Sequence, residues 1–459
     1  MQLNAHKPAR LAATLGLVTA ALLSANSVRA QDQSDPGLMK EGVAEPGSIT
    51  VDSAVLFYQE RGGRVRAIEP STQFVVNRLN GDTISASFTY DSLTGATPNG
   101  AAPSSEPQTF TSLVPSSGSQ STTTSASGNR TVVNIPGTSF VQSRYTVPAN
   151  TLPLDRGFRD HRYAASLGYS MLVDPDTRIK LGGAFSSERD YSSYSGNIGI
   201  SHDLFSKNTT LSLAANLEYD RSKPFLGTPA PFQNYSTQIT GGSDSKTVVS
   251  VVAGITQTLT RFWLTQLNYS YGSGQGYQSD PYKILSLVSQ YSGYPVSYVY
   301  ESRPRSRVRQ SIYWGNKIAM GPTVADLSLR YYHDNWGIDS ITAEASEQVP
   351  VTRNFYVQPL FRYYHQSAAN FFHYYLPFQS SLPQYASADG RLSRFDATTI
   401  GVKAGLRVLP GTELYVDAED YRQTGRHYDR SAPGDLASLN LFSGVHAFSV
   451  MTGFKFKLR

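Results

Sequence analysis

Four arginines at alternate positions, Arg303, Arg305, Arg307 and Arg309, form the densest basic run of the chain. If the run enters a β-strand, alternate side chains share a face, so Arg307 and Arg309 would project together. Guanidinium groups so placed can bind the phosphates of lipopolysaccharide or select anions at a pore mouth. They can also pair with acidic side chains of neighbouring loops, which is the interpretation that we favour.

Further charges of both signs occupy one face of several other segments. If these segments are strands of a closed barrel, this face lines its lumen. Together with Arg307 and Arg309, the candidate residues of the lumen or its mouth are Arg330, Arg362, Lys403, Arg407, Asp326, Glu413, Asp417 and Glu419. Such mixed charges can line a water-filled pore or anchor a folded-in loop through ion pairs. The sequence leaves both interpretations open.

Catalytic chemistry has weaker support. His202, His365 and His446 could serve as bases in a hydrolytic site, but no Gly-x-Ser-x-Gly elbow accompanies them. His333 and His373 could join His365 in holding a metal at a rim, but no pattern of His and acid residues supports this. Phosphate-loop, dinucleotide, calcium-loop and haem-attachment motifs are absent from the sequence. We therefore predict no catalytic residues, no cofactor, no metal site and no enzymatic activity, and an outer-membrane hydrolase is the least favoured alternative.

The segments that carry these residues have a period of two. Between residues 399 and 408, Ile400, Val402, Leu406 and other apolar residues alternate with polar and charged ones. The same alternation recurs in 211–220, 325–332 and 448–458. A strand with one apolar and one polar face lies between an apolar and an aqueous medium, although soluble sandwiches also alternate.

The connections between these segments decide between the two architectures. About sixteen strands are predicted, with 14 to 18 possible, and tight turns such as Asn80-Gly81 and Pro410-Gly411 follow the even-numbered strands. The long connections all follow odd-numbered strands: 94–160, 222–245, 272–306, 367–395 and 424–444. This asymmetry is typical of outer-membrane barrels. We therefore predict an all-β fold, a transmembrane antiparallel β-barrel with both termini periplasmic, whose even strand number leaves no open edge.

The amino-terminal segment and the composition agree with export. Lys7 and Arg10 precede an apolar stretch, 11–23, and Val28-Arg29-Ala30 offers a cleavage site, so we expect a signal peptide at 1–30. A periplasmic lead, 31–49, and the barrel, 50–459, would follow. The apolar stretch is shorter than the roughly 20 residues that a spanning helix needs.

Charge and cysteine content narrow the function. Cleavage would remove three of the 40 basic residues and none of the 35 acidic ones, leaving a net charge of +2, so we predict no nucleic-acid partner. The chain has no cysteine, which excludes a disulfide scaffold and thiolate chemistry.

The longest connection, 94–160, is expected to determine what the barrel does, since loops of this length are usually functional or disordered. Its middle, Ser116 to Gly128, is mostly Ser and Thr and should stay mobile outside. Its ends have turn chemistry or a rigid apolar step and should pack at the mouth and narrow it. The candidate constriction residues are Thr97, Pro98, Asn99, Gly100, Leu152, Pro153, Leu154 and Asp155.

Particular strings resemble a known family. The segment from Tyr90 to Ala101, together with Tyr300-Glu301-Ser302-Arg303-Pro304 and Trp336-Gly337-Ile338, resembles the bacterial domain-of-unknown-function 3570 family. The resemblance implies an outer-membrane barrel without an established activity. It also implies a link to extracytoplasmic redox systems, because such proteins are often encoded near flavin-attaching transferases and small lipoproteins.

The predicted function is thus a pore or transport scaffold of unknown solute in the outer membrane of a Gram-negative bacterium. Its expected surroundings are outer-membrane lipid and lipopolysaccharide. The alternative is a barrel that serves as sheath or partner for a flavin-bearing redox protein, either periplasmic or a lipoprotein.

Overall fold

The computed structural model describes residues 46–115, 123–124, 130–134, 140–237, 239 and 241–458. The predicted signal peptide, 1–30, lies outside these residues, as do most of the predicted lead and most of the segment from Ser116 to Gly128. No helix in the described ranges is long and apolar enough to cross a membrane.

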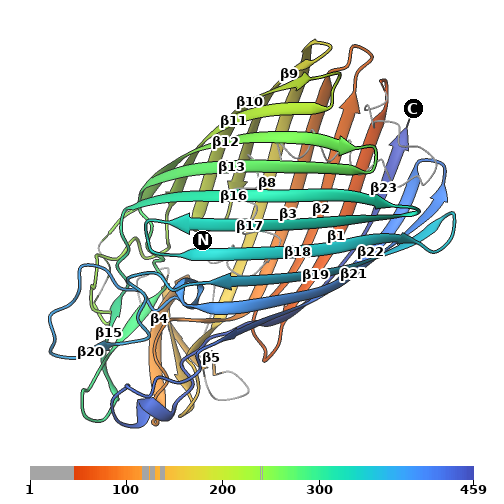
Figure 1. Cartoon of the computed structure of the whole chain (residues 1–459). Coiled ribbons are helices and arrows are strands. Elements are labelled where there is room, and N and C mark those ends of the chain that lie inside the picture. The colour runs from red at the N-terminus through yellow and green to blue at the C-terminus, as the bar shows by residue number, and fades with distance from the viewer. Residues whose placement is uncertain are drawn as a thin grey trace.

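Sixteen antiparallel strands close into one barrel, as predicted (Figure 1). The first and last strands seal the cylinder, with Ile49 opposite Leu458. The strands are β1 (Ile49–Glu60), β2 (Arg66–Asn77), β3 (Thr83–Pro98), β8 (Leu154–Asp174), β9 (Thr177–Ser187), β10 (Tyr191–Leu204), β11 (Thr209–Ser222), β12 (Asp244–Thr260), β13 (Trp263–Gly276), β16 (Ser306–Met320), β17 (Thr323–Asp334), β18 (Asp339–Pro350), β19 (Phe355–Gln366), β21 (Phe395–Leu409), β22 (Thr412–Gly425) and β23 (His446–Leu458).

The two ends of the barrel differ (Figure 1). One end has only tight turns, such as 321–322 and 410–411, and also holds the start of β1 and the end of β23. The other end carries the five longest connections, which gather at the lower left of Figure 1. We call them the short-turn end and the long-loop end.

The outer surface of the barrel is an apolar belt. Phe57, Leu167, Phe361 and Ile400 are all at least half exposed, and Ile400 reaches 65%. Along β21 the exposed residues alternate with buried or half-buried ones, as a pleated strand requires. Exposed apolar side chains over a whole barrel wall are stable next to lipid rather than water.

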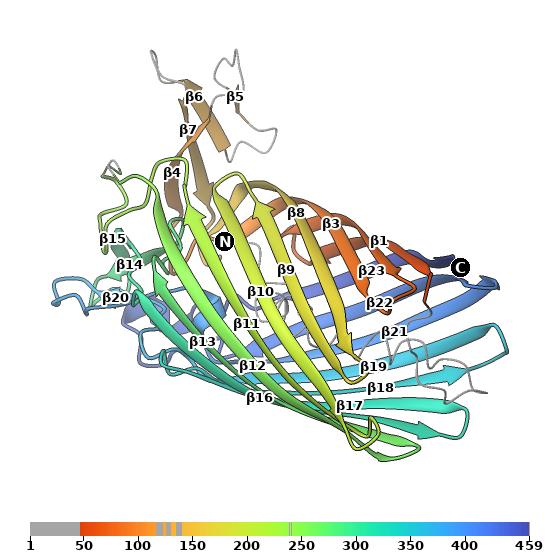
Figure 2. The ribbon, with the colours of Figure 1, turned by 90° about the horizontal axis from the view of Figure 1, so that it is seen from above.

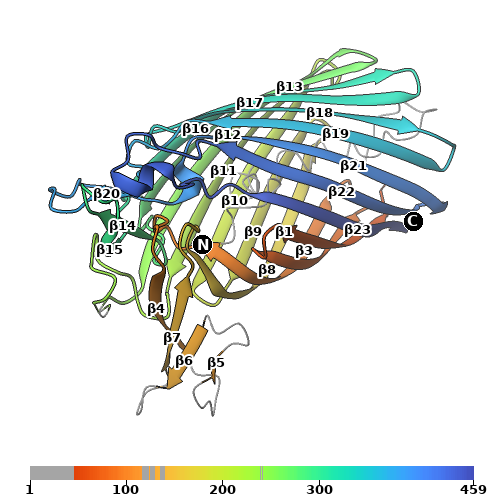
Figure 3. The same ribbon diagram turned by 90° about the horizontal axis from the view of Figure 1, so that it is seen from below.

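The long connections fold into structure of their own (Figure 3). β14 (Ile284–Val288), β15 (Pro295–Tyr300) and β20 (Leu376–Pro377) form a three-stranded sheet. Two short 3-10 helices, η2 (Gly390–Leu392) and η3 (Gly434–Ser438), lie in the last two long connections. We call this assembly of long connections the cap.

The first long connection is shorter than predicted. β3 continues to Pro98 and β8 already begins at Leu154, so the connection spans 99–153 instead of 94–160. It forms a second sheet that projects from the barrel (Figure 2). Its strands are β4 (Gln108–Pro115), β5 (Thr123–Thr124), β6 (Arg130–Asn134) and β7 (Phe140–Val147).

Candidate functional site: a polar lumen beneath a loop cap

The ten charged candidate residues all lie on the inner face of the barrel. Along β17, the exposed Leu327, Leu329 and Tyr331 face outward, so Asp326 and Arg330 face the lumen. The same alternation turns Arg307 and Arg309 of β16, Arg362 of β19, Lys403 and Arg407 of β21, and Glu413, Asp417 and Glu419 of β22 inward. One wall of the lumen therefore carries charges of both signs.

These charges are arranged as complementary pairs on neighbouring strands. Lys403 lies opposite Asp417, and Arg407 lies opposite Glu413. Other opposed pairs are Lys317 with Asp326, at 3.4 Å, and Arg362 with Glu344, at 3.8 Å. In each of these four pairs a cation faces an anion across neighbouring strands, so the two charges of a pair offset each other locally.

A polar chamber occupies the lumen toward the short-turn end. Its volume is about 290 Å³, enough for several water molecules. Its wall spans β1, β16 to β19 and β21 to β23. Charged lining residues are Asp52, Lys317, Asp326, Lys403, Glu413, Asp417 and Lys455.

The arginine run does not form a free basic surface. Arg303 pairs with Glu301 at 2.6 Å, Arg305 with Asp244 at 3.3 Å, and Arg307 with Asp334 at 2.6 Å. Three of the four arginines thus pair with acidic residues, whereas Arg309 makes no ion pair and its buried Nε has no hydrogen-bond partner within the described residues.

Two strands carry the same four residues, Arg330-Tyr331-Tyr332-His333 on β17 and Arg362-Tyr363-Tyr364-His365 on β19, and the first Tyr and the His of each lie on the outside of the barrel. The Tyr331 hydroxyl and His333 Nδ1 both contact Asp339 Oδ1, at 2.7 and 2.9 Å. Tyr363 and His365 contact Asp396 in the same way, at 2.6 and 2.8 Å. These side chains therefore form a polar rim above the apolar belt. No group of three or more metal-ligating side chains comes together within the described residues.

The three histidines considered as hydrolytic bases also have other partners. His365 contacts Asp396 and His446 contacts Asp420, both at 2.8 Å on the outer surface. His202 contacts the Thr177 hydroxyl at 2.8 Å near the short-turn end. The three rings are thus dispersed over different strands and do not share one site.

At the long-loop end, aromatic residues of the loops cover the inner face of the barrel. Phe442 packs against Phe395 and Ala397 of β21 and against Tyr421 of β22. Trp336 packs near Tyr332. The Arg307 guanidinium lies 4.2 Å from the centre of the Trp336 ring. The segments that carry Phe442 and Trp336 therefore turn inward over the lumen, whereas the β4–β7 sheet projects away from it.

β14 is the centre of the cap. It belongs to the connection between β13 and β16, yet its Ile284 N–H donates to the carbonyl of Asn99, from the β3–β8 connection, at 2.9 Å. Val288 is fully buried against Leu436 and Leu441, from the β22–β23 connection. Connections from three sides of the barrel thus meet at one strand, which lies across the mouth.

The candidate constriction residues lie within or beside this cap. Thr97 and Pro98 end β3 and pair with Asp155 and Leu154 at the start of β8, while the Asn99 N–H donates to Pro153. Three of the candidates, Pro98, Gly100 and Leu152, line a small cavity of about 20 Å³ together with Tyr374 and Phe442. All eight residues are thus brought together at the mouth. That they narrow a passage stays a prediction.

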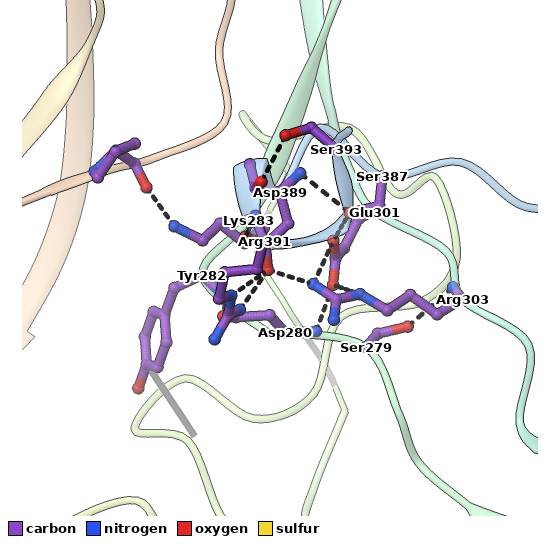
Figure 4. A network of polar contacts seen from close by, with 12 residues as sticks. Ser279, Asp280, Tyr282, Lys283, Glu301, Arg303, Ser387, Asp389, Arg391 and Ser393 are labelled. Atoms are coloured by element: carbon purple, nitrogen blue, oxygen red, sulfur yellow. Dashed lines mark hydrogen bonds and ion pairs between the residues drawn. The ribbon is translucent and has the colours of Figure 1, made fainter. Parts of the chain in front are cut away.

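A buried network of six charged side chains joins two of the long connections (Figure 4). Arg391 donates to Asp280 at 2.8 Å and to Asp389 at 2.6 Å, and Arg303 also pairs with Asp389, at 2.8 Å. Glu301, the remaining acid, accepts from Arg303 and from the Ser387 hydroxyl. We call Asp280, Lys283, Glu301, Arg303, Asp389 and Arg391 the cap network.

Lys283 ties the cap network to the barrel wall, because its ammonium donates to the carbonyl oxygen of Pro98 at the end of β3. Gln366, the last residue of β19, adds a second tie by donating to the carbonyls of Arg391 and Ser393, at 3.0 and 2.7 Å. The network therefore holds the loops to two strands as well as to each other.

Burial and ion pairing shift the pKa values of this network in opposite directions. Burial raises the pKa of Glu301, and this effect outweighs the opposite effect of the neighbouring Arg303 guanidinium, which lowers it. At Asp389 burial is opposed by Arg391 and Arg303, which hold the pKa well below its ordinary value. Burial also lowers the pKa of Lys283 against the pull of Asp389 and Asp280. The acids Asp280 and Asp389 are thus stabilised as anions in the dry interior of the cap.

Sequence reasoning missed five of the six network residues. A usable signal existed, because Glu301-x-Arg303 and Asp389-x-Arg391 repeat the same acid–arginine spacing in two long connections. Nothing in the sequence, however, indicated that these two segments meet.

Comparison of the sequence with known protein families identifies one match. The family model described as "Protein of unknown function (DUF3570)" matches residues 12–456. The chain belongs to this family. No match was found among curated proteins.

Solved structures similar to this DUF3570 chain are barrels at very low identity. CdiB from Acinetobacter baumannii is 8% identical with a TM-score of 0.44, over 89% of this chain and 60% of that one. A ferric enterobactin receptor (PfeA) mutant from Pseudomonas aeruginosa is 9% identical with a TM-score of 0.41, over 88% and 59%. A bacterial polysaccharide outer membrane secretin is 9% identical with a TM-score of 0.41, over 90% and 98%. The DUF3570 chain spans about 60% of the length of the first two.

Proposed function

We propose that this DUF3570 protein is an outer-membrane transport scaffold, a passage whose long-loop mouth is closed at rest by its own cap. The apolar belt supports a membrane location, and the short-turn end then faces the periplasm together with both ends of the barrel sheet. The solute is a polar one that the mixed-charge lumen can accommodate.

The observation that carries this proposal is a polar chamber beneath a cap that crosses the mouth. A chamber lined by paired charges is compatible with water and ions, so the barrel is not filled by an apolar core. The cap above it is held by side chains that come from different connections. A passage closed in this way opens when the cap moves, not when the barrel wall changes.

The cap network is suited to hold such a closed state. Removing one partner of a buried ion pair leaves an uncompensated charge, at a cost of about 3–5 kcal/mol. Arg391 pairs with both Asp280 and Asp389, so its loss removes two ion pairs at once, although Asp389 keeps its pair with Arg303.

Single-channel recording in planar bilayers tests the proposal. The unmodified protein should show rare, brief openings, and Arg391→Ala should raise the open probability at least about tenfold, as expected for a loss of a few kcal/mol. Arg426→Ala is the matched control, because it breaks an exposed pair with Asp429, at 3.5 Å, in the same set of loops.

The outcomes separate the candidate functions. If neither the unmodified protein nor the Arg391→Ala variant ever conducts, the proposed transport function is wrong. If the non-conducting barrel also co-purifies with a flavin-bearing protein, the sheath function is favoured instead.

A further inference from the structure

Basic side chains of neighbouring strands lie side by side on the outer surface at the long-loop end. Arg422 of β22 is opposite His446 of β23. Arg61 directly follows β1, and its backbone N–H donates to the carbonyl of His446 at 2.8 Å. Arg66 begins β2, opposite Gln59 of β1. We call Arg61, Arg66, Arg422 and His446 the rim basic row.

The row has more positive charge than its acidic neighbour can neutralise. Asp420 contacts Arg422 at 3.1 Å and His446 at 2.8 Å, and so fixes both side chains. Arg61 and Arg66 are exposed and make no ion pair within the described ranges. Three arginines against one aspartate leave a charge of +2 even when His446 is neutral.

Apolar residues continue the surface directly below the row. Phe448 lies two residues from His446 on the same face of β23 and is 52% exposed. Phe57 of β1 is 53% exposed and Ile68 of β2 is 42% exposed. The surface thus offers cationic groups above an apolar strip across three adjacent strands, β23, β1 and β2, which matches an amphiphile with an anionic head.

Among anionic heads, phosphate fits this row best. Guanidinium groups bind phosphate oxygens through paired hydrogen bonds, and neighbouring strands about 4.8 Å apart place several groups around one anion. We propose that the rim basic row binds the phosphate of an outer-leaflet glycolipid of the lipopolysaccharide type, with its acyl chains along Phe57, Ile68 and Phe448. This inference rests on the proposed outer-membrane location, and it assigns the phosphate site to a surface other than the arginine run from Arg303 to Arg309.

The experiment compares two triple variants that remove the same charge. The row variant carries Arg61→Gln, Arg66→Gln and Arg422→Gln. The control variant carries Arg78→Gln, Arg261→Gln and Arg353→Gln, three exposed arginines in turns at the short-turn end. Affinities of the detergent-solubilised proteins are measured for bisphosphorylated lipid A, for the same lipid without phosphates, and for inorganic phosphate.

The proposal expects the unmodified protein and the control variant to prefer phosphorylated lipid A to the dephosphorylated lipid. The row variant should lose about tenfold or more of this affinity, since each cation near an anionic lipid surface contributes measurably. Equal affinity in the row and control variants would overturn the site. Inorganic phosphate binding as tightly as lipid A would show a free-phosphate site and also overturn it.

The test also separates this inference from the proposed function. If the unmodified protein binds lipid A in neither form, although it migrates as a folded barrel on unheated gels, the lipid site is overturned and the proposed passage is unaffected. Absence of conductance has no bearing on the lipid measurement.

Discussion

Arg391 is one of two arginines, with Arg303, that join the two connections of the cap network. Its guanidinium reaches Asp280 in one long connection and Asp389 in its own, and both acids are almost completely buried. We expect Arg391→Ala to reduce the local stability of the cap by about 3–5 kcal/mol. Hydrogen exchange of the β14 amides measures this loss, while barrel amides should keep their protection. Unchanged exchange in β14 would contradict the role of Arg391.

The same network predicts how the closed state depends on pH. Asp389 and Asp280 have pKa values below their ordinary value of 3.8 in the folded cap. Their contribution to stability is complete above that value and is lost as pH falls through the depressed pKa values. Glu301, with its raised pKa, has the opposite sign and takes up a proton at higher pH.

Openings in planar bilayers should therefore stay rare from neutral pH to about pH 4 and become frequent only in stronger acid. Asp389→Asn should make openings frequent already at neutral pH, because Arg391 and Arg303 lose an acidic partner, and should weaken the acid response, because the asparagine cannot titrate. An opening transition near neutral pH would show that other groups control the cap.

At the scale of elements, Gly100 allows the first long connection to lie directly on β14. Its φ of +96° suits glycine, and a Cβ added there would lie 2.3 Å from the carbonyl oxygen of Ile284. Gly100→Ala should separate the segment from β14 and make 99–103 sensitive to limited proteolysis, with more frequent channel openings.

Gly62→Ala is the control for this prediction. Gly62 also has a positive φ, +75°, but nothing lies within 4 Å of an added Cβ. It therefore has the backbone strain, about 1 kcal/mol, without the collision. If both variants behave alike, contact with β14 is not what holds the segment.

At the scale of the whole molecule, the proposed orientation can be tested because the chain has no cysteine. Tyr291→Cys places a thiol in the cap at a position that is 92% exposed, and Leu79→Cys places one in a short turn at a position that is 84% exposed. A membrane-impermeant maleimide added to intact cells should label the first and not the second until the cells are lysed. The reverse labelling pattern would show that the barrel has the opposite orientation in the membrane. Labelling of both positions in intact cells would contradict the proposal that the membrane separates the two ends of the barrel.

The sequence by itself determined the barrel. Alternation along each segment and tight turns such as 410–411 are local properties, and pairing of consecutive strands needs only neighbours in the chain. The inward direction of Arg330 and Asp417 follows from the same local alternation. Only the tertiary structure decided the cap, because Arg391 and Asp280 lie 111 residues apart and their segments have no periodic pattern. They meet because closure of the cylinder, with Ile49 beside Leu458, brings separate connections to one mouth.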